Sequence, residues 1–583
     1  MEINKISVKI AGPAGEGVIS AGQVFAKCCS RSGLYVVTEN ERPSLIRGGH
    51  NEFMIRAENT PIYSHINMFN IVIALDKQSI TQHLDELSYQ GAVIYDGESH
   101  KINPEDITRD DVLLVPVPMH SIIKEAGAGK IVENALAVGA CFGLLDHDIS
   151  ILEEVLTQMY GKHPEALESD IKVAKAGYDF VQEFKKNKGV IFTNKLEKIE
   201  DAPKRMLING TLAFNLGAVK AGVSFVSAYP MTPGTGIFQG LIPYAQSHDI
   251  VIVQTEDEIA SINMAIGASY AGVRSLTSTS GGGYALMNEG LSLAGMTETP
   301  VVIAEVMRGG PATGLPTRTE QSDLLFVLHS GHGEFPHVVI APSNVPSCYT
   351  EAQRAFNIAE KYQLPVTVLL DRHNAETFHT IEELPKDLPI ERGVYYTQEE
   401  LDNNPYPNRF SITESGVSKR FNPGTKNARV VNTGNERDEY GLINDVRETR
   451  TAMVEKRNRK LSGVLAELPK PTLEGDADAD VTFISWGSTY NILKDARAFL
   501  KREGISTAHL HLTYMNPFHT KEIQEILATV KNPVLVENSS TGQLSQLIKM
   551  RTGITINKQL LQFDGWPFSP ETIMHKVKNQ EWN

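Results

Sequence analysis

The chain of 583 residues is poor in cysteine, in long apolar runs and in excess positive charge. Its cysteines, Cys28, Cys29, Cys141 and Cys348, form no CxxC pair and no tight cluster, which excludes a disulfide scaffold and argues against an iron–sulfur cluster or structural zinc held by this chain alone. No stretch approaches the roughly 20 apolar residues that span a bilayer. The formal net charge of −15 argues against sequence-independent nucleic-acid binding, which needs clustered Lys and Arg. We therefore expect a cytoplasmic protein without membrane or nucleic-acid partners and without a metal site of its own.

Short apolar runs rich in β-branched residues alternate with helical patterns along most of the chain. The runs are ISVKI, IVIAL, AVIYD, VLLVPV, VSFVSAY, DIVIVQ, PVVIAEV, HVVIAP, PVTVLLD, DVTFISWG and NPVLVEN. Continuous apolar strands separated by helices are typical of parallel sheets that are covered on both faces. With 41% hydrophobic and 21% charged residues, the chain has enough apolar material for several cores. We predict an α/β protein with several doubly wound, mainly parallel sheets.

Length and changes in composition predict three α/β domains and a linker arm. The charged segment 181–206 separates a first domain, residues 1–190, from a second domain, residues 200–380. Residues 381–475 are polar and dotted with proline, with one predicted helix in RETRTAMVEKRNRKLSGVLAEL. We expect this segment to be an extended arm that lies across neighbouring domains. Residues 476–583 are expected to form the third α/β unit.

The segment YPMTP, residues 229–233, holds Thr232 between two prolines directly after an apolar strand. Proline fixes its own φ, lacks a backbone donor and favours an extended conformation in the residue before it. Such a turn presents a hydroxyl rigidly and leaves backbone polar groups without strand partners, as a ligand site requires. An ordinary surface turn explains the same segment, because Pro and Gly are the usual turn residues.

The segment ISVKIAGPAGEGVISAG predicts a strand, a glycine loop and a helix that begins near Val18. Gly12, Gly15 and Gly17 permit positive φ and a close approach of backbone N–H groups to an anion at the helix start. The spacing is GxxGxG rather than GxGxxG, and no acidic residue ends a second strand, so NAD is disfavoured. Phosphate binding and a simple tight turn both fit the loop. Arg47, beside another glycine turn, is either a further cation for this site or a surface arginine.

The segment TEDEIASINMAIGASY predicts a helix with Thr255 as its N-cap and Glu258 as the capping-box acid. Its expected apolar stripe consists of Ile259, Ile262, Ile266 and Tyr270. Glu258 is therefore either a cap or the carboxyl that a thiamine enzyme needs at the start of a helix, under an apolar wall. In the second case burial keeps the carboxyl protonated, and its hydrogen bond to the aminopyrimidine ring activates the coenzyme.

The segment PVVIAEVMRGGPATGLPT brings Arg308 to the end of a buried strand and then Thr317 into a loop rich in Gly and Pro. An arginine at the end of a parallel strand faces the crevice in which α/β proteins bind ligands, and its fork matches a carboxylate. An ion pair with a nearby Asp or Glu is the alternative role for Arg308.

Three of these segments, in this order, resemble the pyrimidine-binding domain of the 2-oxoacid:ferredoxin oxidoreductases. They are GTLAFNLGAVKAGVSFVSAYPMTPGTG, EDEIASINMAIGASYAG and VMRGGPATGLPT. Residues 1 to about 190, with GPAGEG, RGGHNEFMIR and ENALAVGACFGLL, are similar to the gamma subunit of the family. Residues 206–583 are similar to its alpha subunit, including TGNERDEYG and a C-terminal unit with VENSSTGQL that is like the transketolase C-terminal domain. The resemblance implies a fusion of gamma and alpha subunits, and the RGGPATGLPT loop is most similar to the 2-oxoglutarate branch.

The resemblance also implies roles for individual residues. Glu258 would activate the pyrimidine of thiamine diphosphate, Thr232 and Arg308 would contact the carboxylate or carbonyl of the oxoacid, and Thr317 would lie close to the substrate. Coenzyme A would bind near the loop from Gly12 to Gly17, with Arg47 as a weaker candidate. Two departures from the family pattern are Met231, where Ile is usual, and Glu16, where Gln is common; the acid at Glu16 puts the anion affinity of the loop in doubt.

A GDG motif followed some thirty residues later by Asn, which holds Mg²⁺ and diphosphate in thiamine enzymes, is missing from the sequence. By resemblance, a beta subunit would supply the diphosphate and Mg²⁺ site and a [4Fe–4S] cluster, and the expected assembly is a dimer of alpha–beta pairs with ferredoxin as the electron partner. The implied reaction is the reversible oxidative decarboxylation of 2-oxoglutarate to succinyl-CoA. Pyruvate or a branched-chain oxoacid is the alternative substrate, and a non-catalytic assembly or regulatory subunit is the alternative of another class.

Overall fold

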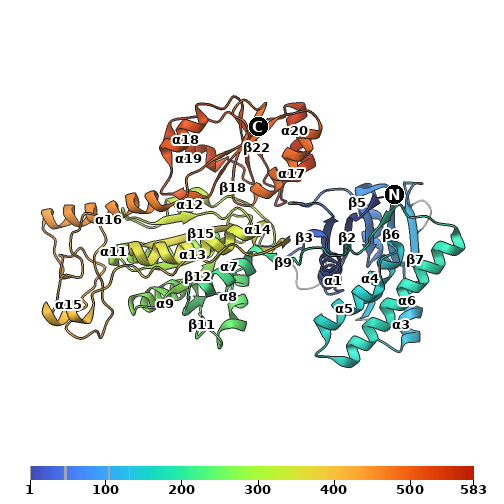
Figure 1. The fold of residues 1–583 in the computed structure, drawn as a ribbon, viewed down its shortest axis with the longest axis horizontal. Helices are drawn as coiled ribbons and strands as arrows, with labels where there is room; N and C mark the ends of the chain where they lie inside the picture. The colour runs from blue at the N-terminus through green and yellow to red at the C-terminus, as the bar shows by residue number, and fades with distance from the viewer. Residues whose placement is uncertain (1, 45–48, 101, 103–105, 130–131, 583) are drawn as a thin grey trace.

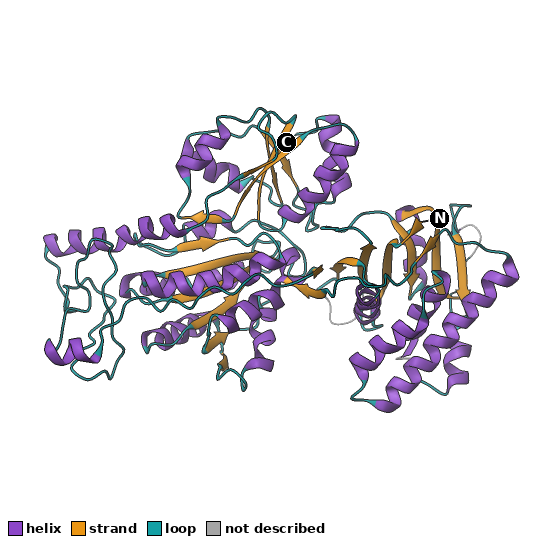
Figure 2. Cartoon of the chain, viewed as in Figure 1, coloured by secondary structure: helices purple, strands orange, loops and turns teal. Residues whose placement is uncertain are grey.

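The computed structural model describes residues 2–44, 49–100, 102, 106–129 and 132–582 (Figure 1). Arg47 lies outside these residues. Helices and strands alternate through most of the described chain (Figure 2), and sheets of eight, seven, five and two strands are present in it. No helix in these ranges is both long enough and apolar enough to cross a membrane.

The eight-stranded sheet belongs mainly to the first domain, drawn in blue in Figure 1. Its strands, in order across the sheet, are β7 (Leu113–Val117), β6 (Leu87–Asp96), β5 (Phe69–Ala74), β2 (Lys5–Pro13), β4 (His50–Glu58), β3 (Tyr35–Glu41), β16 (Phe378–Ile381) and β9 (Met206–Asn209). The first four are parallel, and the pairs from β2–β4 to β16–β9 are antiparallel. The sheet therefore continues across the predicted boundary between the first and second domains.

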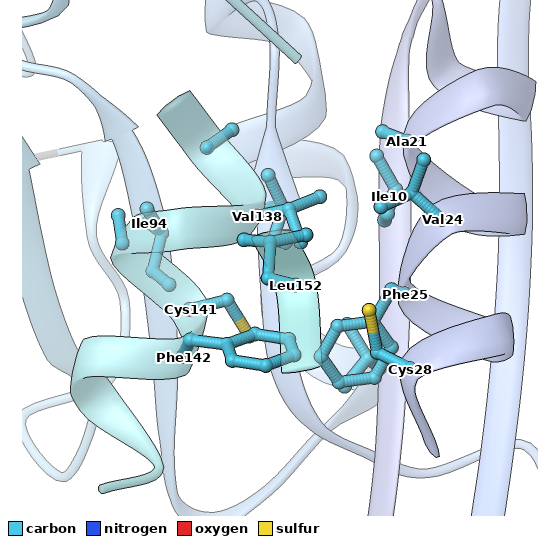
Figure 3. Close-up of a cluster of buried hydrophobic side chains, with 14 of the residues drawn as sticks. Ile10, Ala21, Val24, Phe25, Cys28, Ile94, Val138, Cys141, Phe142 and Leu152 are labelled. Carbon is cyan, nitrogen blue, oxygen red and sulfur yellow. The ribbon is translucent and has the colours of Figure 1, made fainter. Parts of the chain in front are cut away.

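Helices pack on both faces of this sheet. One face is covered by α1 (Val18–Arg31), α4 (Glu133–Leu144), α5 (Ile149–Tyr160) and α6 (Pro164–Lys188), with α3 (Met119–Ala126) beside α6. The other face is covered by α2 (Lys77–Gln82) and the 3₁₀ turn η1 (Leu84–Glu86). A short pair, β1 (Glu2–Ile3) and β8 (Asn194–Lys195), closes the domain. Figure 3 shows Cys28 and Cys141 among Phe25, Phe142 and other apolar side chains. Burial raises the pKa of both thiols well above the ordinary range, so these cysteines act as core residues.

The seven-stranded sheet forms the second domain. Its strands, in order, are β11 (Val251–Gln254), β10 (Phe225–Ala228), β12 (Ser275–Thr279), β13 (Val301–Met307), β15 (Pro365–Asp371), β14 (Val338–Ile340) and β20 (Tyr514–Asn516). All neighbours are parallel except β14 and β20. The helices of this domain are α7 (Gly210–Lys220), α8 (Thr235–Leu241), η4 (Ile242–Tyr244), α9 (Glu258–Tyr270), α10 (Gly281–Leu286), α11 (Asn288–Thr297), α12 (Leu324–Leu328), α13 (Val345–Tyr362) and α14 (Arg372–Glu376).

The five-stranded sheet lies in the C-terminal unit, drawn in red in Figure 1. Its strands are β17 (Leu473–Glu474), β19 (Thr507–Leu512), β18 (Val481–Trp486), β21 (Pro533–Glu537) and β22 (Lys558–Leu561), and its helices are α17 (Thr489–Arg502), α18 (Thr520–Leu527), α19 (Gln543–Thr552) and α20 (Pro570–Asn579). The arm between the second domain and this unit contains α15 (Gln398–Asn403) and α16 (Arg447–Glu467). Lys456 and Lys460 of α16 are buried and pair with Glu298 at the end of α11, and Val464 of the same helix packs into the core of the second domain, so ion pairs and apolar contacts together attach this helix.

The prediction of an α/β fold with mainly parallel sheets is confirmed, and each quoted apolar run contains a strand of the structure. The sequence analysis missed β3 and β4. These two strands carry charged side chains on one face, including Glu39, Glu41, Glu52 and Arg56, and all four are buried. A strand with buried charges does not have the apolar signature of a core strand.

Partners from distant parts of the chain neutralise this charged face. Arg56 donates to Asp495 of α17 over 2.8 Å, and the same carboxylate oxygen accepts hydrogen bonds from the backbone N–H groups of Tyr63 and Ser64. Arg56 also pairs with Glu58. Both partners of the Arg56–Asp495 pair are buried, and the loss of Asp495 would leave Arg56 with Glu58 as its remaining carboxylate partner among the described residues.

We predict that Asp495→Ala lowers the free energy of unfolding of the C-terminal unit by about 3 kcal/mol, because it leaves Arg56 without its buried partner. The three tryptophans, Trp486, Trp566 and Trp582, all lie in this unit, so a urea titration followed by tryptophan fluorescence measures the effect. The matched control is Glu503→Ala, which removes an exposed partner of Lys578 in the same unit and should cost less than about 1 kcal/mol. Equal destabilisation by the two variants would contradict the prediction.

Candidate active site

Three of the segments that the sequence analysis singled out meet at one edge of the seven-stranded sheet. The turn 229–234 follows β10, the glycine triplet 281–283 follows β12, and Arg308 follows β13; the three strands are neighbours in the order β10, β12, β13. Helix α9 begins at Glu258 and follows the edge strand β11 in the chain. The carboxyl ends of parallel strands are the usual ligand edge of an α/β sheet.

Direct contacts connect these segments. Arg308 Nη1 donates a hydrogen bond to the carbonyl oxygen of Thr232 over 2.5 Å. On the other side of the turn, a Cβ added at Gly234 would lie 2.4 Å from the carbonyl oxygen of Thr279, so only glycine permits this close approach to the end of β12. The structure therefore brings Thr232 and Arg308 together, as the sequence analysis expected for two groups of one site.

Glu258 is the first residue of α9 and is only 2% exposed. Its Oε1 atom is buried and accepts no hydrogen bond from a described residue. Burial raises the pKa of Glu258, and the nearby carboxylate of Asp257 raises it further. A buried carboxyl with an unpartnered oxygen and a raised pKa is suited to form a hydrogen bond with a ligand.

Two local predictions about α9 are wrong. The N-cap is Asp257, whose carboxylate accepts from the backbone N–H of Ala260, and not Thr255. With Asp257 in that position, Glu258 is not a capping-box acid, so the structure removes the capping role that was the alternative for Glu258. The predicted apolar stripe is also only half buried: Ile262 and Ile266 lie in the core, whereas Ile259 and Tyr270 are exposed.

The glycine triplet at the start of α10 lies against Glu258. A Cβ added at Gly283 would be 2.4 Å from Oε1 of Glu258 and 2.1 Å from Oγ1 of Thr279. At Gly282, by contrast, a Cβ would meet no atom of this chain within 4 Å. A side chain at Gly283 would therefore fill the space beside the unpartnered carboxyl oxygen.

Arg308 is half buried and donates only to Thr232 among the described residues. No described carboxylate forms an ion pair with it, although Asp323 and Glu305 lie close enough to act on its pKa. Burial lowers the pKa of Arg308, and these two acids oppose the shift. The ion pair that the sequence analysis left open is therefore not formed with a described residue, and the guanidinium keeps two nitrogens for a ligand.

The sequence analysis missed the acids behind Arg308. Glu305, on β13, is completely buried with both carboxylate oxygens unpartnered, and burial raises its pKa well above the ordinary range. Burial also raises the pKa of Asp323, to about 6, with help from Glu320. Asp323 Oδ2 lies 2.4 Å from the Cβ position of Gly281, so it borders the same glycine triplet as Glu258. Glu305 could have been found from the sequence, because it is a charged residue inside the apolar run VVIAEVM.

The loop after Arg308 contacts the first domain. Thr317 Oγ1 donates to the carbonyl oxygen of Arg42 over 2.6 Å, and Arg318 pairs with Glu41 at the end of β3. The hydroxyl of Thr317 is thus bonded to the segment that joins β3 and β4, and it forms no hydrogen bond with Arg308 or Thr232.

The glycines of the first loop have different roles. Gly15 and Gly17 have positive φ of 92° and 74°, whereas Gly12 lies inside β2 without positive φ. A Cβ at Gly17, the N-cap of α1, would collide with Asn134, and one at Gly12 would lie 2.8 Å from Leu75 Cβ; at Gly15 the space is open. Gly15 and Gly17 use the positive φ that the sequence analysis said glycine permits, whereas Gly12 is needed for close packing against Leu75.

Two cavities flank this loop. One, of about 520 Å³, lies at the carboxyl ends of β2, β5 and β6; the other, of about 380 Å³, is mainly apolar and lies between α1, α4, α5 and α6. The larger one is lined by the acids Glu16, Asp76, Asp96 and Glu133 and by the bases His100, His120 and Lys124. Its acidic lining, like Glu16 itself, disfavours the binding of phosphate inside this cavity.

One group of three potential metal ligands occurs among the described residues: His50, Glu52 and His83. The ammonium of Lys9 already bonds to Glu52 over 2.6 Å, which places a positive charge where a metal ion would need negative ones. The four cysteines are all free and buried.

Comparison with known proteins gives the chain a family. The family model described as "Pyruvate flavodoxin/ferredoxin oxidoreductase, thiamine diP-bdg" matches residues 216–456, and the model "Pyruvate ferredoxin/flavodoxin oxidoreductase" matches residues 7–180. The chain is 31% identical to the 2-oxoacid:ferredoxin oxidoreductase subunit alpha of Saccharolobus solfataricus over 98% of this chain and 97% of that protein. It is 28% identical to the 2-oxoglutarate oxidoreductase subunit KorA of Mycobacterium tuberculosis over 94% of this chain and 87% of that one.

Among solved structures, the chain is similar to the 2-oxoglutarate:ferredoxin oxidoreductase from Magnetococcus marinus with 2-oxoglutarate, coenzyme A and succinyl-CoA bound. The TM-score is 0.90, the identity is 33%, and 99% of each chain is covered. The thiamine-binding family model, residues 216–456, includes six of the seven strands of the second sheet and the buried Glu258 at its ligand edge, and it extends into the arm. This chain therefore belongs to the alpha subunits of the 2-oxoacid:ferredoxin oxidoreductases.

Proposed function

We propose that this chain, together with a beta subunit, catalyses the reversible oxidative decarboxylation of 2-oxoglutarate to succinyl-CoA, with ferredoxin as the electron acceptor. The observation that carries the proposal is the similarity over the whole chain, at 33% identity, to a structure described with 2-oxoglutarate, coenzyme A and succinyl-CoA bound. The reaction converts 2-oxoglutarate and CoA–SH into succinyl-CoA, CO₂, one proton and two electrons.

Glu258 is the residue that we assign to coenzyme activation. When bound, thiamine diphosphate supplies a nucleophilic carbon and an electron sink. The residues present fit its pyrimidine: Glu258 is buried, its Oε1 is unpartnered, and Gly283 leaves the adjoining space open. Because its pKa is raised, Glu258 keeps its proton to higher pH than an exposed glutamate and presents it at Oε1 to a ring nitrogen.

Arg308 and Thr232 are assigned to the oxoacid. Arg308 is fixed by its hydrogen bond to the Thr232 carbonyl and has two further nitrogens for a carboxylate beside the reacting carbonyl. Because CO₂ must leave from this carboxylate, moderate ground-state binding serves turnover better than very tight binding. Thr317 stays in the proposal as a group near the substrate, held by its bond to Arg42.

Coenzyme A is assigned to the loop from Gly12 to Gly17. The open space at Gly15 and the N-terminus of the 14-residue helix α1 support an anion there. The acids of the adjoining cavity disfavour phosphates inside it, so the phosphates are expected at the loop itself. Arg47 remains a candidate outside the described residues.

A beta subunit is assigned Mg²⁺, the diphosphate site and the [4Fe–4S] cluster, in a dimer of alpha–beta pairs. The names of the relatives as alpha subunits support a partner. Large apolar side chains also lie exposed around the proposed coenzyme site, on the turn after β10, on α9 and on α10: Tyr229, Ile259, Met264 and Leu286. An apolar patch at the edge of an incomplete site is suited to a subunit contact.

Two alternatives differ in what they require. Pyruvate or a branched-chain oxoacid would need the same Glu258 and Arg308 but a different contact for the distal end of the substrate. A non-catalytic assembly or regulatory subunit would not need a buried, unpartnered carboxyl beside an open glycine triplet, so the state of Glu258 favours an enzyme.

The first prediction concerns the substrate. With the beta subunit, coenzyme A and a viologen dye, kcat/KM for 2-oxoglutarate should exceed that for pyruvate and for 2-oxoisovalerate at least tenfold. Dye reduction and thioester formation are both measured for each oxoacid. A preference for pyruvate or the branched acid would replace the substrate assignment, and no turnover with any oxoacid would favour the non-catalytic alternative.

The second prediction uses the glycine triplet. Gly283→Ala should lower turnover at least 100-fold, because its Cβ would displace the Glu258 carboxyl, which lies 2.4 Å away. The matched control is Gly282→Ala, whose Cβ meets no atom of this chain within 4 Å and which should leave the unfolding midpoint unchanged. Thiamine affinity and turnover are measured for both variants, so that the effect of displacing the Glu258 carboxyl is distinguished from the effect of adding a methyl group to the triplet. Normal turnover in Gly283→Ala would contradict the role of Glu258.

The third prediction concerns Arg308. Arg308→Lys should lower kcat/KM for the oxoacid at least 100-fold, because a lysine ammonium cannot offer two parallel hydrogen bonds to a carboxylate. Arg318→Lys is the control, since Arg318 lies in the same loop but pairs with Glu41 of the first domain, and its effect should be less than tenfold. Similar losses in the two variants would count against a substrate role for Arg308.

A further inference from the structure

A second group of titratable side chains lies at the start of β4, apart from the proposed oxoacid site. It consists of His50, His83, Glu86, Lys9 and Glu52. These side chains come from β4, the end of α2, η1 and β2, on the charged face of the eight-stranded sheet. The function proposed above uses none of them.

The histidines form a continuous hydrogen-bonded row. His50 Nε2 lies 2.7 Å from His83 Nε2, and His83 Nδ1 lies 2.9 Å from Glu86 Oε2. His83 is completely buried, whereas the Glu86 side chain is 38% exposed. The row therefore leads from His50 through the interior to a carboxylate in contact with solvent.

The direction of the hydrogen bonds follows from Glu86. A carboxylate only accepts, so His83 Nδ1 must donate, and in a neutral ring Nε2 of His83 then accepts. His50 Nε2 must therefore carry the proton, which leaves Nδ1 of His50 as a bare acceptor. That Nδ1 atom is buried and has no partner among the described residues, an arrangement that is costly unless a donor reaches it.

The charges around the row favour a mobile proton over a metal ion. Glu52 and Glu86 contribute two negative charges, and Lys9 bonds to both, at 2.6 and 2.5 Å. One negative charge remains, and a single extra proton on the histidine pair would neutralise it. Asp76, Glu52 and Lys9 also act on His50, but burial is the largest influence and lowers its pKa, so the ring is neutral at pH 7 and accepts a proton.

His50 also has a suitable position. Its register partner in β2 is Pro13, in the first turn of the glycine loop. His50 is the first residue of β4, and Arg42, whose carbonyl accepts the hydrogen bond of Thr317, follows β3 in the same hairpin. His50 therefore belongs to the hairpin that contacts both the proposed coenzyme A loop and the proposed oxoacid loop.

We propose that His50 accepts the thiol proton of coenzyme A, directly or through one water, and that His83 passes a proton to Glu86 and on to solvent. The inference rests on the proposed function, because the overall reaction releases one proton for each thioester formed. The S–H bond breaks, Nδ1 of His50 gains the proton, Nε2 of His50 gives its own to His83, and Nδ1 of His83 gives one to Glu86. The thiolate electron pair would form the new C–S bond to the acyl carbon while the bond from that carbon to the coenzyme breaks, and the two electrons of the oxidation would go to ferredoxin.

Glu86 is suited to be the last group of the row. Burial raises its pKa, but the hydrogen bonds from His83 and Lys9 outweigh this effect and hold the pKa at about 2. The carboxylate therefore does not retain the proton near pH 7 but gives it to water. His83 acts through His50 and is a positioning and relay residue in this scheme.

The test compares His50→Gln and His83→Gln in the complex with the beta subunit. Two steps are measured separately: reduction of the cluster by 2-oxoglutarate without coenzyme A, and thioester formation after coenzyme A is added. Both variants should keep the first step within about twofold and slow the second about 100-fold, and added imidazole should restore part of the loss in His50→Gln. The wild-type rate of the second step should fall as pH decreases through the lowered pKa of His50, and this dependence should disappear in His50→Gln.

The control is His147→Gln, which removes another buried histidine of the first domain, one that bonds to Ser32 and to the carbonyl of Leu196. It should alter stability without changing the pH profile of either step. An unchanged second step in both relay variants would overturn the inference while leaving the proposed function intact. One zinc ion per chain that is lost in His50→Gln would overturn it as well, since the pair would then be a metal site. Failure of the first step in the wild type would instead contradict the proposed function.

Discussion

Buried ion pairs on one face of the eight-stranded sheet join parts of the chain that are hundreds of residues apart. The pairs are Glu39–His373, Glu41–Arg318 and Arg56–Asp495. A buried charge without a partner costs several kcal/mol, so strands β3 and β4 are stable in this form only when the second domain and the C-terminal unit supply the opposite charges. The pair with His373 illustrates this dependence: burial would lower the pKa of this histidine, but the adjacent Glu39 raises it.

The same constraint positions the loops of the candidate site. Arg318 is held by Glu41 and Thr317 by the Arg42 carbonyl, so the loop after β13 is attached to the β3–β4 hairpin of the first domain. The hairpin in turn pairs with β2, which leads into the glycine loop. A single hairpin thus connects the proposed oxoacid loop with the proposed coenzyme A loop. In a chain that fuses two domains, this arrangement fixes the distance between two reactants that must meet.

The sequence predicted those parts of the fold and of the site that depend on local patterns. Continuous apolar runs predicted strands such as β13 and β15. The Pro-bounded turn and the strand-end arginine pointed to Thr232 and Arg308, which are hydrogen-bonded to each other in the structure, and their role in a site stays a prediction. The missed features depend on residues that are distant in the sequence. Strand β4 looks polar in the sequence because its charged residues have distant partners: Arg56 pairs with Asp495, and Glu52 pairs with Lys9. Asp323 lies beside Gly281 because β12 and β13 are neighbours in the sheet. The N-cap of α9 was predicted wrongly for a local reason, since two acceptable capping residues, Thr255 and Asp257, precede the helix within three positions.

The charge state of the acids around Arg308 decides what this residue can bind. Glu305 is buried with both oxygens unpartnered, and burial raises its pKa well above the ordinary range, so its charged form is disfavoured. Neither Glu305 nor another described carboxylate forms an ion pair with the guanidinium, although Asp323 and Glu305 act on its pKa. Arg308 therefore retains its positive charge and two donor nitrogens in a half-buried place. Because the attraction between charges is stronger there than in water, a bidentate carboxylate is the ligand that gains most from this arrangement.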